Sequence, residues 1–123
     1  MASSPAYAEH PHHKIEIGPE TTSARVTFAG RVVAESTRAR VLHESRCPPR
    51  VYIPAADVDQ TLLERTSHTT WCGFKGHASY YSLRVGDEVA ENAVWTYEDP
   101  FDEVASIGNH LAFWGDKLTI END

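Results

Sequence analysis

The sequence predicts a mainly β domain with two antiparallel sheets packed face to face, in a β-tent or sandwich-like arrangement. Short runs rich in β-branched and aromatic residues recur along the chain from residue 14, and turn signals separate them. Several of these runs are joined by glycine-containing pairs of residues, as in hairpins. Packing one sheet on another is the usual way in which such a chain buries its apolar faces.

The strand-like runs, in chain order, are ARVTF, RVVAE, RVYIP, SYYSLRV, AVWTY, LAFW and KLTIE. Gly30, Gly86 and Gly115 each begin a two-residue connection with the residue that follows, as a type II′ hairpin turn requires. Three antiparallel hairpins are therefore predicted. The segments 30–36 and 86–92 share Gly, Val, Ala and Glu at matching positions, which suggests that two of these hairpins are related.

One short helix is expected near residues 100–108, in the run EDPFDEVASIGNH. Asp99 is the expected N-cap, Pro100 is the expected first helical residue, and Gly108 closes the helix.

The first 13 residues, MASSPAYAEHPHH, are small, polar and proline-containing. Such a composition is typical of a flexible N-terminal arm. We therefore expect an arm over residues 1–13 and a single domain over residues 14–123. A domain of this size can bury a sizeable core without a disulfide or a metal.

Composition and charge limit the classes of partner. The formal net charge of -7 disfavours duplex nucleic acid and anionic membranes, because both need clustered Lys and Arg. Cys47 and Cys72 are too few for a disulfide framework, and the sequence contains no leader-like or long apolar run, so a cytoplasmic protein is expected. These properties do not distinguish a monomer from a dimer.

The stretch WCGFKGHASYY at residues 71–81 is the candidate functional loop. Lys75 lies three residues after Cys72, where a nearby cation would lower the pKa of the thiol and make it nucleophilic. Glycines at 73 and 76 would expose backbone N–H groups to an anion. Three interpretations follow: a tight turn in which Cys72 packs as a small apolar residue, an anion-binding pocket anchored by Lys75, or thiol catalysis with Cys72 as the catalytic residue.

Aromatic residues around this loop form a second candidate feature. In a strand over residues 77–85, alternate side chains from His77 to Val85 would face the core, and Tyr80 would point the other way. Tyr80, with Trp71 and Trp95, could then line a groove for a flat or cationic ligand. The alternative is that these rings only fill the core or cover a sheet face.

The sequence favours neither a metal nor a cofactor. Helix capping explains most of the acidic run YEDPFDE without Mg²⁺. The pairs His43 and Cys47, and His68 and Cys72, have a zinc-like spacing, but residues four apart in a strand lie roughly 13 Å from each other. Signature motifs for phosphate loops, serine hydrolases, zinc proteases and dinucleotide binding do not occur in the sequence, and no cofactor is predicted.

The run TTWCGFKGHASYYSL, followed by ENAVWTYEDP and HLAFW, resembles the domain-of-unknown-function family 427. That family has a Thr-x-Cys-Pro-aromatic-Lys-Gly loop, then Ala-Ser-Tyr, then Ala-x-Trp-x-Tyr-Glu. The resemblance extends from about residue 13 to about residue 120. It implies a small antiparallel β domain, and a nucleotidyltransferase-like label sometimes given to the family loosely implies that activity.

The resemblance also places Glu44 and Glu98 at motif positions near strand ends, so both are candidate site carboxylates. Gly73 stands where the family has proline. Because proline fixes φ and glycine frees it, the loop is expected to be more mobile here, which weakens any role that needs a rigid Cys72.

Three functions follow from these observations. The first is binding of a small anionic or aromatic ligand by Glu44, Trp71, Cys72, Lys75, Tyr80, Trp95 and Glu98. The second is an enzyme, either thiol-dependent through Cys72 or a Mg²⁺-dependent nucleotidyltransferase that uses Glu44 and Glu98. The third is a protein-interaction module.

Overall fold

The computed structural model describes residues 3–123, which form nine antiparallel strands, one short α-helix and three 3-10 helices. The strands are β1 (Ile15–Ile17), β2 (Thr22–Phe28), β3 (Arg31–Glu44), β4 (Arg50–Pro54), β5 (Leu63–Cys72), β6 (Gly76–Val85), β7 (Glu88–Thr96), β8 (His110–Phe113) and β9 (Leu118–Asn122). The helices are α1 (Ala6–Glu9), η1 (Ala55–Asp57), η2 (Gln60–Leu62) and η3 (Asp102–Ile107). The mainly β class is confirmed, whereas two separate packed sheets are not, because the strands form one nine-stranded sheet.

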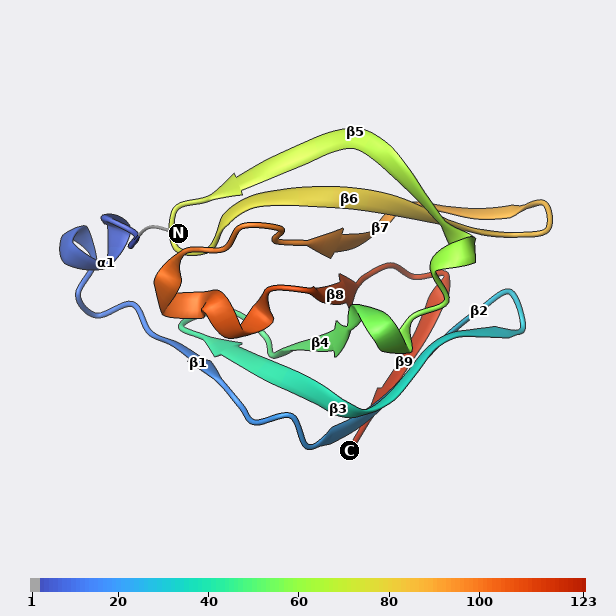
Figure 1. Ribbon diagram of the computed structural model, residues 1–123, viewed down its shortest axis with the longest axis horizontal. Helices are drawn as coiled ribbons and strands as arrows, with labels where there is room; N and C mark the ends of the chain where they lie inside the picture. Colours follow the sequence, from blue (N-terminus) through green and yellow to red (C-terminus); the bar gives the residue numbers. More distant parts are fainter. Residues whose placement is uncertain (1–2) are drawn as a thin grey trace.

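The strands follow one continuous path of pairing, in the order β5-β6-β7-β8-β4-β3-β2-β9, and β1 adds to the end of β3. In Figure 1, β5, β6 and β7 lie on one side of the molecule and β1, β2 and β3 on the other. The short strands β8 and β4 connect the two sides, because β8 pairs with β7 and β4 pairs with β3. The two groups of strands therefore enclose a shared interior.

Two of the three hairpins expected from glycine are present. The β6–β7 hairpin turns at Gly86, whose φ is 59°, and Val85 pairs with Glu88 on either side of it, as predicted. The β2–β3 hairpin turns one residue earlier than predicted, at Ala29 and Gly30. Both residues have positive φ, 51° and 76°, so this is the type I′ pattern and not type II′.

The prediction of a third hairpin, at Gly115, is wrong. The segment after Gly115 forms β9, which pairs with β2 and not with β8. The reason is that a strand has only two edges, and β4 and β7 already occupy both edges of β8. The chain therefore crosses to the free edge of β2, where Leu118 pairs with Phe28.

The short helix near residues 100–108 is present as the 3-10 helix η3, which is kinked at Val104. The predicted cap is wrong: the N-cap is Phe101, and no side chain caps the helix. The cause is that the Phe101 N–H already donates to the carbonyl of Lys75 over 3.1 Å. This bond keeps Phe101 extended, so the helix starts two residues later than Asp99 would have placed it.

Two apolar clusters stabilise the fold. The first core fills the interior between the two groups of strands and consists of Ala24, Val26, Phe28, Val33, Ala34, Ala39, Ile53, Val58, Leu62, Leu83, Ala90, Ala93, Val94, Leu111 and Phe113. The second core lies under η3 and β1 and consists of Leu42, Tyr52, Ala78, Tyr97, Val104, Ile107 and Ala112. Burial of these side chains supplies most of the favourable free energy of folding.

Strand β6 contributes to both cores, from opposite faces. Tyr81 and Leu83 pack in or against the first core, whereas Ala78 and Tyr80 pack in or against the second. The prediction that His77 belongs to a buried face is wrong, because His77 is exposed. Both faces of this strand are covered, so simple alternation of inward and outward positions does not apply to it.

Candidate functional site

The segment 71–77 forms the tight turn between β5 and β6. Cys72 pairs with Gly76, and the Lys75 N–H donates to the Cys72 carbonyl over 3.2 Å. Gly76 has a φ of 117°, a conformation that glycine adopts readily and other residues do not. The turn directs Lys75 inward, where only 8% of the residue is exposed.

Lys75 forms a buried ion pair with Glu44, the last residue of β3. The Lys75 Nζ lies 2.5 Å from Glu44 Oε1, and His13 Nε2 lies 2.8 Å from Glu44 Oε2. Burial alone would raise the pKa of Glu44, but the hydrogen bonds and charges of Lys75 and His13 outweigh it and hold that pKa below its ordinary value. Glu44 therefore stays ionised and balances the charge of Lys75.

A pocket of about 540 Å³ opens beside this ion pair. Its walls are rich in aromatic side chains and contain a few polar groups. The lining residues are Leu42, Glu44, Cys47, Pro48, Arg50, Tyr52, His68, Lys75, Tyr80, Glu91, Asn92, Trp95, Tyr97 and Trp114. This set is called the aromatic pocket below.

The aromatic walls are held in place by the second core and by hydrogen bonds. Tyr80 and Trp95 are cross-strand partners on β6 and β7, and both pack against the second core. The Trp95 Nε1–H donates to the Tyr52 hydroxyl over 3.3 Å. Burial raises the pKa of Tyr52 to about 12 and also raises the pKa of Tyr97, so both hydroxyls are neutral at physiological pH.

Arg50, on β4, is the cation of the pocket that has no anionic partner. Its guanidinium carbon lies 5.9 Å from the centroid of the Trp95 ring, within cation–π range. Within residues 3–123, no carboxylate oxygen lies within 4.0 Å of it. Arg50 pairs with Leu42 across β3 and β4, and Tyr52 is two residues further on the same strand.

Four of the residues predicted for the site meet in the aromatic pocket: Glu44, Lys75, Tyr80 and Trp95. Cys72 does not line this pocket and packs against the second core. That position fits the interpretation of Cys72 as a small apolar residue in a tight turn. The other cysteine, Cys47, is exposed and lines the pocket.

Trp71 and Glu98 lie outside the pocket. Trp71 is 59% exposed, with its ring 4.6 Å from that of His77 and 5.6 Å from that of Phe101. Glu98 lines a different cavity and forms an ion pair with Arg65 at 2.6 Å.

Arg65 and a hydrogen bond from Ser79 together lower the pKa of Glu98. The cross-strand pair Ser79 and Thr96 alternates with the pair Tyr80 and Trp95 along β6 and β7, so the two pairs lie on opposite faces. Glu98 and Glu44 are therefore not brought together in one cavity. Over residues 3–123, no three His, Cys, Asp or Glu side chains gather closely enough to hold a metal ion.

Sequence reasoning missed Arg50 and Tyr52. A signal for both was present in the run RVYIP, because alternate residues of a strand share one face. An arginine and a tyrosine on the same face of a β-rich run indicate that this face is not purely apolar, and so could have suggested a polar or aromatic site there.

The N-terminal segment packs against the outer side of the β5–β6 turn. The Ser4 N–H donates to Glu103 Oε1 over 3.0 Å, and the Ser4 hydroxyl donates to the Gly73 carbonyl. The His13 ring stacks on Phe74 with a centroid distance of 3.8 Å. These contacts give the arm a defined position in the structure, and its flexibility in solution stays a prediction.

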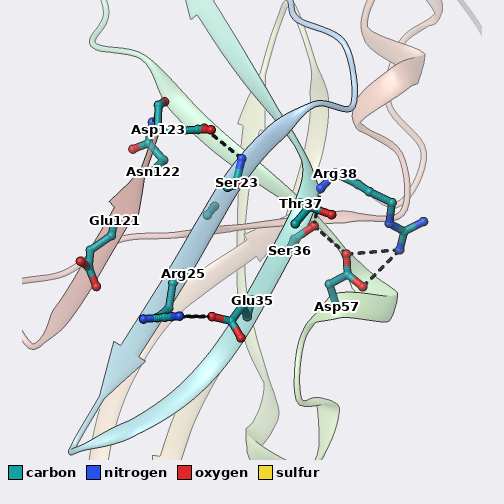
Figure 2. Close-up of a pocket in the computed structure, with 11 residues that line it drawn as sticks. Ser23, Arg25, Glu35, Ser36, Thr37, Arg38, Asp57, Glu121, Asn122 and Asp123 are labelled. Carbon is teal, nitrogen blue, oxygen red and sulfur yellow. Dashed lines mark hydrogen bonds and ion pairs between the residues drawn. The ribbon is translucent and has the colours of Figure 1, made fainter.

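A larger cavity, about 690 Å³, lies near the C-terminus between β2, β3 and β9 (Figure 2). Figure 2 shows that four of its charged side chains already bind one another, whereas Asp123 accepts from the Ser23 backbone and Glu121 has no partner drawn. Arg25 pairs with Glu35, and Asp57 accepts hydrogen bonds from Ser36 and Arg38. Because these groups are already paired, we place the candidate site at the aromatic pocket.

The fold and the pocket define a small, mainly β domain with an aromatic cleft beside a buried Lys–Glu pair. A model of the family described as "Domain of unknown function (DUF427)" matches residues 16–123. The chain belongs to this family, as its motifs predict. No curated protein matches it. Among the helices of residues 3–123, none has both the length and the apolar character needed to cross a membrane.

Proposed function

We propose that this protein binds a small, flat organic ligand in the aromatic pocket. The observation that carries the proposal is the pocket itself, whose volume of about 540 Å³ is within the usual range of small-molecule sites. Like such sites, it combines aromatic walls with a small number of oriented polar groups.

In this proposal the aromatic rings provide stacking surfaces and the polar groups set orientation. Tyr80 and Trp114 offer ring faces, and Asn92 and His68 offer hydrogen bonds from the rim. Glu44 accepts hydrogen bonds from the ligand. The neighbouring Lys75 holds Glu44 in position and keeps it ionised.

The test is a thermal-shift screen against carboxylates, sugar phosphates, nucleotides and heteroaromatic compounds, with and without Mg²⁺. A ligand at 100 times its Kd stabilises the native state by about 2.7 kcal/mol, which raises Tm by several degrees. Trp114→Ala and Trp71→Ala form a matched pair, because the two residues are 60% and 59% exposed but only Trp114 lines the pocket. We expect the shift to fall in Trp114→Ala and to persist in Trp71→Ala.

Two results would contradict the proposal. A screen without hits would exclude these ligand classes and turn attention to a protein-interaction role. Equal loss of the shift in both tryptophan variants would mean that binding does not occur in this pocket.

Nothing specific favours the enzymatic alternatives. Nucleotidyl transfer with Mg²⁺ needs carboxylates around one ion, and Glu44 and Glu98 line separate cavities. The thiol-dependent reaction predicted for Cys72 needs an accessible nucleophile, and Cys72 packs against the second core. Thermal-shift hits that require both Mg²⁺ and a nucleotide would favour the nucleotidyltransferase alternative over simple ligand binding.

We also propose a cytoplasmic location. Cys47 and Cys72 are both free, which is typical of proteins in reducing compartments. The acidic net charge of -7 argues against duplex nucleic acid as a partner.

A further inference from the structure

The charges that line the aromatic pocket differ in how they are neutralised. Lys75 and Glu44 neutralise each other, at a distance of 2.5 Å between Nζ and Oε1. Glu91 is exposed at the rim. Arg50 is half-buried and, within residues 3–123, has no carboxylate partner. Arg50 and Glu91 are therefore the two charged residues of the pocket without a direct ion-pair partner among residues 3–123, and Arg50 is the one that contacts aromatic surface.

The other arginines make this unpaired charge informative. Arg25, Arg31, Arg38, Arg40, Arg65 and Arg84 each have a carboxylate within 4.0 Å. In the described part of the chain, the two arginines without such a partner are Arg46, which is exposed, and Arg50, which lines the pocket. A partly desolvated guanidinium without an anion is unfavourable, and a bound anion would relieve that cost.

The chemistry of Arg50 limits which anion fits. Its guanidinium lies over the Trp95 ring, a position in which stacking orients the group and leaves N–H donors free. The planar fork of arginine matches a carboxylate or a phosphate in a bidentate hydrogen-bonded pair. Glu44 and Glu91 line the same pocket, and their negative charges disfavour a phosphate monoester with two charges more than a carboxylate with one. Among the remaining wall residues, Tyr80, Tyr97 and Trp114 present aromatic surface that suits a flat ring attached to that anion.

We propose that Arg50 is the anion-binding residue of the pocket and that the ligand is a planar aromatic carboxylate. This inference rests on the proposed function, and it assigns to Arg50 the anchoring role that the sequence had suggested for Lys75. Lys75 is a positioning residue, because its charge is used to hold Glu44.

The experiment uses three probes that share one ring system: 2-naphthoate, the neutral 2-naphthamide and 2-naphthyl phosphate. Isothermal titration calorimetry on the full chain measures the affinity of each. We expect 2-naphthoate to bind at least about tenfold more tightly than 2-naphthamide, because a bidentate charged pair is much stronger than a neutral one. We also expect it to bind more tightly than the phosphate.

Arg50→Gln tests the residue, with Arg46→Gln as the matched control. Both substitutions remove one unpaired arginine, but Arg46 does not line the aromatic pocket. Arg50→Gln should lower the affinity for 2-naphthoate about tenfold or more and leave the affinity for 2-naphthamide unchanged. Arg46→Gln should change neither affinity. Arg50→Lys keeps the charge without the planar fork and should recover only part of the affinity. A thermal melt of each variant shows whether it is folded.

The contrary outcomes separate the two proposals. Equal affinity for acid and amide, or no effect of Arg50→Gln in a folded protein, would overturn the role of Arg50 while the pocket remained a binding site. Tighter, Arg50-dependent binding of 2-naphthyl phosphate would replace the carboxylate with a phosphoryl group. If none of the three probes binds, the carboxylate assignment is wrong, and the proposed function fails too only if the wider thermal-shift screen also gives no hit.

Discussion

At the scale of single residues, Glu44 connects parts of the chain that are far apart in sequence. One carboxylate oxygen contacts Lys75 from the β5–β6 turn, and the other contacts His13 from the N-terminal segment. Only about a tenth of either side chain in the Lys75–Glu44 pair is exposed. Removing one charge of such a pair leaves the other buried without compensation, which costs more than the pair itself contributes.

Glu44→Gln should therefore destabilise the protein by up to about 3 kcal/mol, near the lower end of the range for a broken buried pair. The pKa of Glu44 is lowered in the folded state, so its contribution is complete above the ordinary pKa of 4.5 and is lost as pH falls through the lower folded pKa. Denaturant unfolding between pH 3 and pH 7 measures this. The difference between wild type and variant should be complete at pH 7 and shrink as the pH falls below 4.5.

A difference that did not depend on pH in the acid range would show that lost packing, and not the charge of Glu44, causes the destabilisation. The double variant Lys75→Met with Glu44→Leu provides a second check. It should be more stable than either single variant, because neither charge of the Lys75–Glu44 pair is left buried without the other.

The residues of the site were only partly predictable from the sequence. Glu44, Lys75, Tyr80 and Trp95 were named because family motifs and local composition point to them, and they line one pocket. Arg50 was not named, because it lies outside those motifs and its significance depends on what surrounds it. Whether an arginine has a carboxylate partner is decided by tertiary packing, which residue spacing does not reveal.

At the scale of elements, local turn chemistry predicted two hairpins and failed for the third. Glycine with positive φ occurs at Gly30, Gly86 and Gly115 alike. Glycine permits a turn but does not determine which strand the chain pairs with afterwards. The pairing partner depends on which strands still have a free edge, and both edges of β8 are occupied by β4 and β7.

The β2–β3 turn offers a test of turn chemistry. Ala29 has a φ of 51°, which disfavours a residue with a Cβ, and asparagine tolerates this region better. Ala29→Asn should stabilise the protein by about 1 kcal/mol, as measured by chemical denaturation. Ala56→Asn is the control, because Ala56 is exposed and has no positive φ. Equal effects of the two substitutions would argue against relief of strain at Ala29.

At the scale of the whole molecule, the N-terminal segment and the turn that carries Lys75 form one surface. In Figure 1, α1 lies at the same end of the molecule as η3. The Tyr7 hydroxyl donates to the Phe74 carbonyl over 3.2 Å, and burial raises the pKa of Tyr7 to about 12. The composition of residues 1–13 predicts flexibility. It does not reveal the contacts of this segment, because the partner residues are distant in the sequence.

Deleting residues 1–12 should speed hydrogen exchange of the backbone amides at positions 73–75 and lower the free energy of unfolding by about 1 kcal/mol, the scale of one lost aromatic pair. Hydrogen exchange with mass spectrometry measures the first effect. Unchanged exchange at the turn after deletion would mean that the arm is mobile in solution, as its composition predicts.

The arrangement of the strands has a consequence for self-association. Within the described residues, β5 pairs on one side only, with β6, so the other edge of this ten-residue strand has no strand partner. Such an edge can recruit strands from other molecules and seed aggregates. Here the strand reads LERTSHTTWC, with Glu64 and Arg65 near one end and hydroxyl side chains through its middle. Charged and hydrated side chains of this kind discourage edge-to-edge pairing, so we expect the polarity of β5 to oppose aggregation through this edge.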